Sequence, residues 1–171
     1  MHMSDSREIN APTSEVWAAI LDADVLKQCV PGCTEMAGNA SDGFDATVVQ
    51  KVGPVKATFK GHVTLSDLDE PNSLHLAGEG KGGAAGFAKG GADVTLTATE
   101  NGGTLLHYEV EAKVGGKLAQ LGSRIVDGFA KKMADQFFNN FKDAVEGPSE
   151  EGDATEETGE KKKGWLKRIV S

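Results

Sequence analysis

The side chains of this sequence that could do acid–base or metal chemistry are few and do not converge. His62, His75 and His107 each alternate with the inward apolar residues of a predicted strand, so all three are expected to face outward. A metal site needs several converging ligands, and a general base needs a partner within hydrogen-bond reach. The sequence therefore predicts solvated histidines, with no metal ligand and no catalytic residue.

The two cysteines, Cys29 and Cys33, flank a Pro-Gly turn with the spacing C-x3-C. A structural metal site would need further ligands at a similar spacing. Buried or idle thiols are the favoured interpretation, and a disulfide or redox pair is the alternative.

A glycine pattern typical of dinucleotide sites is present without its helix. Gly78, Gly80 and Gly83 satisfy G-x-G-x-x-G, and Glu100 lies near the distance expected for a ribose-binding acid. A dinucleotide site requires a helix to begin at the glycines, whereas this sequence runs into an alternating strand from Ala92. Nucleotide binding is therefore disfavoured.

The same glycine-rich run predicts a mobile loop. Segment 80–91 is interpreted as a gate over a cavity, with Phe87 as its apolar plug and Lys81 and Lys89 as its charges. A plain wide hairpin is the alternative.

Charge divides the 171-residue chain into three segments. Residues 1–146 carry a net charge of −7 and are long enough to close one core; residues 147–160 carry six acids and no base; residues 161–171 carry five bases and no acid. We expect one folded domain, an acidic flexible linker and a basic tip. An acidic body repels nucleic acid, so no nucleic-acid partner is expected.

The basic tip has the pattern of a helix that lies on an anionic membrane surface. Its apolar residues form one helical stripe with bases around it. The predicted membrane-binding residues are Lys161, Lys162, Lys163, Trp165, Leu166, Lys167, Arg168, Ile169 and Val170. A disordered solubilising tail is the alternative.

The N-terminus lacks the apolar core of a signal peptide, and no apolar run approaches the roughly 18 residues that span a bilayer. The protein is therefore expected in the cytoplasm, peripheral at the inner face of the cell membrane. Met1-His2-Met3 is interpreted as an added leader and set aside.

Apolar spacing predicts a strand, two short helices, a long antiparallel meander and one long terminal helix. The first short helix is expected after Pro12 and the second around Val25, and a period of two dominates residues 44–114. In residues 118–145 apolar positions recur every three or four, which predicts one helix about 43 Å long. Such a helix must cross most of the sheet.

Small residues dominate the predicted inward face of the sheet. They are Ala46, Ala57, Gly61, Gly78, Ala98 and Ala112. A packed core would normally place larger aliphatic or aromatic side chains there. We therefore predict an apolar cavity between the sheet and the helix; the alternative is a core filled by the phenylalanines of the helix.

Four motifs, in order along residues 7–146, resemble the carbon monoxide dehydrogenase G-subunit family. They are Val30-Pro-Gly-Cys33, Val52-Gly-Pro-Val55, the glycine-rich run 78–94 and the segment 114–124. That family belongs to the START-like (SRPBCC) superfamily. The resemblance implies the fold class α+β, a helix-grip fold whose antiparallel curved sheet wraps around a long C-terminal helix and encloses an apolar cavity.

The resemblance also implies a function. It implies an accessory carrier protein that couples or recruits a molybdenum carbon monoxide dehydrogenase to the membrane and handles a respiratory quinone, menaquinone or ubiquinone, with no covalently bound cofactor. Because the family also occurs beside other molybdenum hydroxylases, the partner is carbon monoxide dehydrogenase or a related enzyme.

The candidate ligand-binding residues are Ala57, Phe59, Gly61, Leu76, Phe87, Leu96, Tyr108, Leu118, Leu121, Ile125 and Phe129. At the start of the long helix, Lys117, Gln120, Ser123 and Arg124 are either solvated surface or, with the free backbone amides, a site for a quinone carbonyl. Two other functions stay open: a helix-grip enzyme acting on a lipid or polyketide, which would need titratable side chains in the pocket, and a ligand-free membrane adaptor, which would have a filled core.

Overall fold

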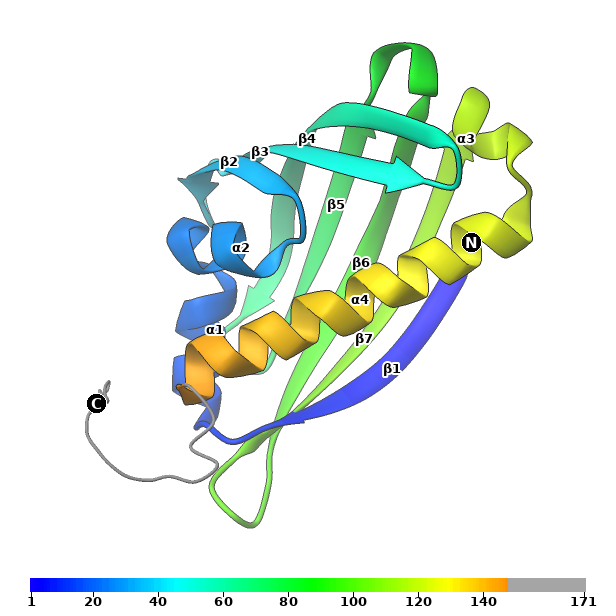
Figure 1. Ribbon diagram of the computed structural model, residues 1–171. Coiled ribbons are helices and arrows are strands. Elements are labelled where there is room, and N and C mark those ends of the chain that lie inside the picture. Colours follow the sequence, from blue (N-terminus) through cyan, green and yellow to red (C-terminus); the bar gives the residue numbers. More distant parts are fainter. Residues whose placement is uncertain (148–171) are drawn as a thin grey trace.

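The computed structural model describes residues 1–147 as a curled sheet with one long helix across its concave face (Figure 1). The strands are β1 (His2–Ile9), β2 (Cys33–Asn39), β3 (Gly43–Val52), β4 (Val55–Asp69), β5 (Ser73–Lys81), β6 (Phe87–Ala98) and β7 (Thr104–Gly115). They form a single antiparallel sheet in the order β1-β7-β6-β5-β4-β3-β2. The predicted meander is confirmed, because β2 to β6 each pair with the next strand along the chain.

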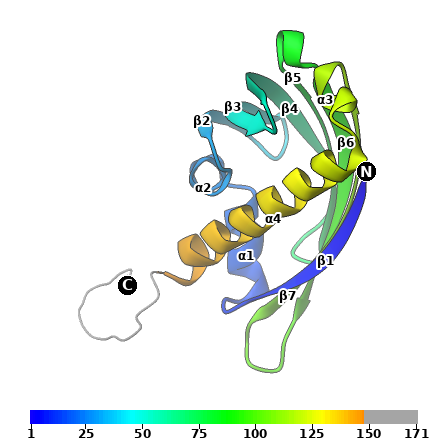
Figure 2. The same ribbon diagram turned by 45° about the vertical axis from the view of Figure 1, so that its right-hand side comes forward.

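Two short helices carry the chain from one edge strand, β1, to the other, β2. They are α1 (Thr13–Ile20) and α2 (Ala23–Cys29), as the sequence predicts. The Asp22 side chain caps α2 by accepting hydrogen bonds from the backbone amides of Asp24 and Val25. Both helices lie beside the C-terminal part of the long helix (Figure 2).

The terminal helix is broken where a single helix was predicted. A short helix, α3 (Lys117–Gln120), precedes the long helix α4 (Ser123–Glu146). Gly122 between them has φ of 92°, a left-handed conformation that other residues rarely adopt. The apolar spacing of three and four residues continues through the break, which is why the spacing alone predicted one helix. The prediction was wrong because Gly122 ends the helical backbone conformation between α3 and α4.

The glycine-rich segment is also more regular than expected. β5 extends to Lys81 and β6 begins at Phe87, so only a short turn with the 3-10 helix η1 (Gly83–Ala85) separates the strands. The predicted loop over 80–91 is therefore wrong in extent, and the alternative of a hairpin describes the segment better.

The packed core occupies one end of the molecule. Its buried residues come from α1, α2, the sheet, the turn before α1 and the C-terminal half of α4: Ile9, Ala11, Val16, Trp17, Cys29, Leu74, Val94, Leu96, Leu106, Tyr108, Phe138 and Phe141. Within this cluster the Tyr108 ring stacks on Phe138 with 5.1 Å between ring centroids. The only buried residues of α4 are Phe138 and Phe141, so its N-terminal half is held less tightly.

An ion pair links edge strand β1 to α4. The Arg7 guanidinium donates a hydrogen bond to the Asp135 carboxylate at 2.6 Å and lies 5.2 Å from the centre of the Phe138 ring. Burial alone would lower the pKa of Arg7, but the hydrogen bond to Asp135 and the interaction with Tyr108 outweigh it and raise that pKa. Hydrogen bonding to Arg7 lowers the pKa of Asp135, so both groups are charged at neutral pH.

The first three residues, which the sequence analysis set aside, belong to the fold. His2 and Met3 are in β1, and the amino group of Met1 donates a hydrogen bond to the carbonyl of Ala112 at 2.9 Å. The linker from residue 148 and the basic tip lie outside the described residues.

Candidate functional site: an apolar cavity beneath the long helix

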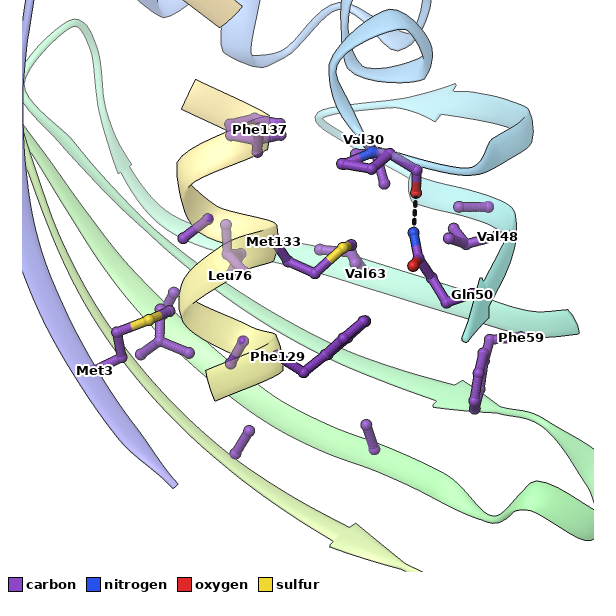
Figure 3. A pocket seen from close by; sticks show the side chains of 18 of the residues that line it. Met3, Val30, Val48, Gln50, Phe59, Val63, Leu76, Phe129, Met133 and Phe137 are labelled. Carbon is purple, nitrogen blue, oxygen red and sulfur yellow. Dashed lines mark hydrogen bonds between the residues drawn. The ribbon is translucent and has the colours of Figure 1, made fainter. Parts of the chain in front are cut away.

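A cavity of about 620 Å³ lies between the concave face of the sheet and α4. The predicted cavity is therefore present at one end of the molecule, while Phe138 and Phe141 fill the other end. Representative wall residues are Met3, Val48, Val63, Phe129, Met133 and Phe137, whose side chains Figure 3 shows around the space. A volume of this size is within the range of about 300–1,000 Å³ that is typical of small-molecule sites.

Among the described residues of this wall, only Gln50 and Tyr108 have polar side-chain atoms other than sulfur. Gln50 follows Phe44, Ala46 and Val48 on the inward face of β3. Its carboxamide nitrogen donates a hydrogen bond to the carbonyl of Pro31, and its carboxamide oxygen lies on the cavity side (Figure 3). That oxygen accepts no hydrogen bond from residues 1–147, so it is available to a ligand.

The Tyr108 side chain interacts mainly with residues outside the cavity. Its hydroxyl interacts with the Arg7 guanidinium closely enough to raise the pKa of Arg7, and its ring is stacked in the core on Phe138. The side chain is only 5% exposed. Tyr108 therefore contributes mainly ring surface to the wall, and Gln50 is the polar group best placed to orient a ligand.

The structure places five of the predicted ligand-binding residues in the cavity wall: Phe59, Leu76, Tyr108, Leu118 and Phe129. They come from β4, β5, β7, α3 and α4, so the cavity joins distant parts of the chain. Contact of these side chains with a ligand stays a prediction.

The other predicted residues lie outside the wall. Ala57 and Gly61 are on the inward face of β4, paired with Gln50 and Ala46, but their small side chains do not reach the cavity. Leu96 is buried in the packed core, and Leu121 packs near Gly53.

Phe87 and Ile125 are exposed instead of lining the cavity. Their exposed fractions are 41% and 44%. Ala88 lines the cavity, so Phe87, its neighbour in β6, points to the opposite face, where its ring covers Gly115. The interpretation of Phe87 as a plug is therefore wrong.

Sequence reasoning missed several wall residues. Gln50 continues the alternation of β3 and could have been found by extending it two positions. Met1 and Met3 line the cavity although the leader was set aside, and Met133 and Ala130 lie on the predicted apolar face of the long helix.

The histidines face outward, as predicted. His62 and His75 pair with Asp45 and Asp93 on neighbouring strands, with nitrogen–oxygen distances of 2.7 and 2.8 Å. His107 is hydrogen bonded to the Ser6 hydroxyl at 2.9 Å. Within residues 1–147 no three His, Cys, Asp or Glu side chains are grouped to hold a metal ion.

Both cysteines are free thiols in the structure. Cys29 is fully buried beside α4, where Asn140 donates a hydrogen bond to its backbone carbonyl. Burial, with a smaller contribution from Asp143, raises the pKa of the Cys29 thiol to about 11. Burial also raises the pKa of Cys33. Thiols with raised pKa values are poor nucleophiles, which favours the interpretation of idle cysteines.

Among the described helices, none is long and apolar enough to cross a membrane. The predicted membrane-binding residues Lys161 to Val170 lie outside the described part of the chain.

A long helix gripped by a curled antiparallel sheet over an apolar cavity defines a helix-grip, START-like protein. Solved structures support this class. A START superfamily protein from Mycobacterium smegmatis superposes with a TM-score of 0.63 at 14% identity, covering 85% of this chain and 97% of that one. A conserved protein from Geobacillus kaustophilus reaches a TM-score of 0.79 at 27% identity, covering 85% and 95% of the two chains.

Within this class, the chain belongs to the carbon monoxide dehydrogenase G-subunit (CoxG) family, whose model matches residues 6–146. The match covers all the elements of the fold from the middle of β1 to the end of α4. Comparison with curated protein sequences finds no match.

Proposed function

We propose that this protein is a carrier that holds a respiratory quinone, menaquinone or ubiquinone, in the cavity beneath α4 and couples a molybdenum carbon monoxide dehydrogenase or related enzyme to the membrane. The observation that carries the ligand class is the nearly apolar cavity wall with one available carboxamide. Membership of the CoxG family supports the partner enzyme. The basic tip, residues 161–171, is proposed to hold the chain on the anionic membrane surface.

The chemistry of Gln50 suits both redox forms of a quinone. Its free carboxamide oxygen can accept a hydrogen bond from a quinol hydroxyl. The nitrogen has two hydrogens, one of which is used on Pro31, so the other can be donated to a quinone carbonyl. The same side chain can therefore bind the ring of the quinone and the ring of the quinol, so it suits transport of the ligand in both directions between membrane and enzyme. The apolar wall holds the prenyl chain.

The wall supports carriage over catalysis. None of the described residues that line the cavity is a carboxylate, imidazole, lysine or thiol. A cyclase or hydrolase acting in this space would need such a group near the reacting atoms.

The test is quinone binding by a variant with a filled cavity. Ala46 lines the cavity, and its neighbour Gly61 is a poorer site for substitution because a Cβ there would lie 3.2 Å from the carbonyl oxygen of Glu79. We expect Ala46→Phe to lower the affinity for short-chain ubiquinone and menaquinone analogues at least tenfold, measured by equilibrium dialysis of the full chain. The control is Thr58→Phe, which adds the same ring on the exposed face of β4.

Equal quinone binding by the two variants, with both folded by circular dichroism, would exclude this cavity as the site. Absence of quinone binding by the parent protein would exclude the carrier function itself.

A further inference from the structure

Three segments that meet at one end of the molecule carry only basic charges. They are residues 51–60 at the β3–β4 hairpin, 80–91 around η1, and 112–126 from β7 through α3 into α4. A Cβ on Gly86 would collide with the carbonyl of Gly115, and one on Gly53 would touch Ile125, so the three segments are in close contact. We name them together the basic end; in Figure 1 it lies around η1 and α3.

Every charged residue in these segments is an exposed base: Lys51, Lys56, Lys60, Lys81, Lys89, Lys113, Lys117 and Arg124. None of them forms an ion pair with an acid in residues 1–147. Their ammonium and guanidinium groups therefore stay without a direct ionic contact in the described domain, although Glu79, Glu111 and Asp127 border the three segments.

Several of these bases face one another across the sheet. Lys51 is opposite Lys56, and Lys60 is opposite Lys81. Lys89 lies between Lys113 on β7 and Glu79 on β5, so it has one neighbour of each sign. Like charges at directly opposed positions destabilise a sheet. Since folding alone does not require this repeated repulsion, the arrangement indicates an anionic partner.

The turns at the other end of the sheet have the opposite sign. Their charged residues are Asp42, Asp45, Asp67, Asp69, Glu70 and Glu100, with no base in residues 39–45, 66–73 or 99–104. The domain is therefore strongly polarised although its net charge is negative, and an anionic surface would orient it with the basic end forward.

Exposed apolar side chains favour a bilayer as this partner. Phe87 and Ile125 at the basic end are 41% and 44% exposed, and bases flank them. Leu68 is similarly exposed, at 46%, but lies between Asp67 and Asp69. Bases that attract lipid headgroups, beside apolar side chains that can enter the interface, are the combination used by peripheral membrane proteins.

We propose that the basic end is a second membrane-docking surface, through which the folded domain itself lies on an anionic bilayer. The same segments contribute Val52, Phe59, Ala88, Val114 and Leu118 to the cavity wall, so docking brings this end of the cavity to the lipid. We infer that this docking serves the transfer of a lipophilic ligand between the bilayer and the cavity, an inference that rests on the proposed carrier function. α4 separates the basic end from Glu146 by about 36 Å.

The experiment compares charge-matched variants of the full chain on phosphatidylcholine vesicles with and without phosphatidylglycerol. Lys56→Gln with Lys117→Gln removes two charges from the basic end. The control, Lys27→Gln with Lys132→Gln, removes two exposed charges elsewhere. Since each base near an anionic surface contributes up to about a fivefold gain in partitioning, we expect the basic-end variant to bind phosphatidylglycerol vesicles about tenfold more weakly than the control.

A second pair tests the apolar contribution. We expect Ile125→Ser to weaken vesicle binding severalfold and Leu68→Ser to leave it unchanged, although the two side chains are about equally exposed.

Equal vesicle binding by the two charge variants overturns the proposal. Unchanged vesicle binding together with weaker binding of the basic-end variant to the dehydrogenase also overturns it, because the surface then serves a protein partner.

Quinone binding by the same variants separates the two proposals. Loss of vesicle binding with normal quinone affinity supports the docking surface. A parent protein that binds vesicles through the basic end but takes up no quinone refutes the carrier function alone.

Discussion

At the scale of single residues, Gln50 is a polar group of the described cavity wall whose hydrogen-bonding capacity is only partly used. Its hydrogen bond to Pro31 fixes the carboxamide orientation and joins β3 to the turn after α2. A fixed polar group in an apolar wall orients a ligand at little entropic cost, since the side chain is already ordered.

We expect Gln50→Leu to lower the affinity for ubiquinone and menaquinone analogues about fivefold, because one hydrogen bond contributes about 1 kcal/mol. The measurement is equilibrium dialysis with a quinone analogue and with a prenyl hydrocarbon that lacks the carbonyl groups. Affinity for the hydrocarbon should be unchanged or higher. An equal loss for both compounds would mean that the substitution disturbs the turn at Pro31 and does not remove a contact with the ring.

The cysteines permit a second prediction at this scale. With its pKa raised to about 11, the Cys29 thiol is almost entirely protonated at pH 8, and its side chain has no exposed surface. We expect Ellman's reagent at pH 8 to modify Cys33 within minutes and Cys29 only on unfolding. Cys33→Ser isolates the buried thiol. Rapid loss of both thiols without unfolding, with formation of a disulfide, would favour the redox pair instead.

At the scale of elements, alternation along the strands predicted which residues face the cavity where apolar and polar residues alternate cleanly. Phe59, Leu76 and Tyr108 were placed in this way, and all three are in the wall. Phe87 was assigned to a loop instead, because a strand made largely of glycine and alanine shows no contrast between its two faces. It is the register of β6 against β7, set by long-range pairing, that turns Ala88 inward.

The start of the terminal helix shows a different limit. Leu118, Leu121 and Ile125 keep a spacing of three and four residues through the break. The apolar pattern therefore does not reveal that the helix is interrupted. The signal was Gly122, but a glycine in a helical pattern is compatible with both a break and a continuous helix. Gly128 is the second case, since it lies within α4.

These two glycines provide a matched prediction. Gly128 has open space around its Cα and helical backbone, so Gly128→Ala should raise the free energy of unfolding by about 1 kcal/mol. Gly122 also has open space, but its φ of 92° makes Gly122→Ala destabilising by about 1 kcal/mol or more. Urea unfolding of both variants checks the signs. Stabilisation by both substitutions would indicate that α3 and α4 form one continuous helix in solution.

At the scale of the whole molecule, the domain has a filled half and a hollow half that share α4 and the sheet. Phe138 and Phe141 anchor the C-terminal half of α4 in the core, whereas Phe129 and Met133 in the other half face the cavity. A cavity lining lacks the dispersion contacts of a packed interior, so the hollow half should open at a lower free energy. This difference gives a carrier a route for ligand exchange that leaves the core intact.

Hydrogen exchange can measure the difference in opening free energy between the two halves of α4. We expect backbone amides in residues 127–133 of α4 to exchange at least tenfold faster than those in residues 136–142, although both segments are helical. A saturating menaquinone analogue should slow exchange in the first segment and leave the second nearly unchanged, because a bound ligand stabilises the half that it fills. The Ala46→Phe variant should show slow exchange in the first segment without ligand and no further change when the analogue is added. Uniform protection along α4 in the parent protein would mean that the cavity half is as rigid as the core, and that ligand exchange requires opening at another place in the fold.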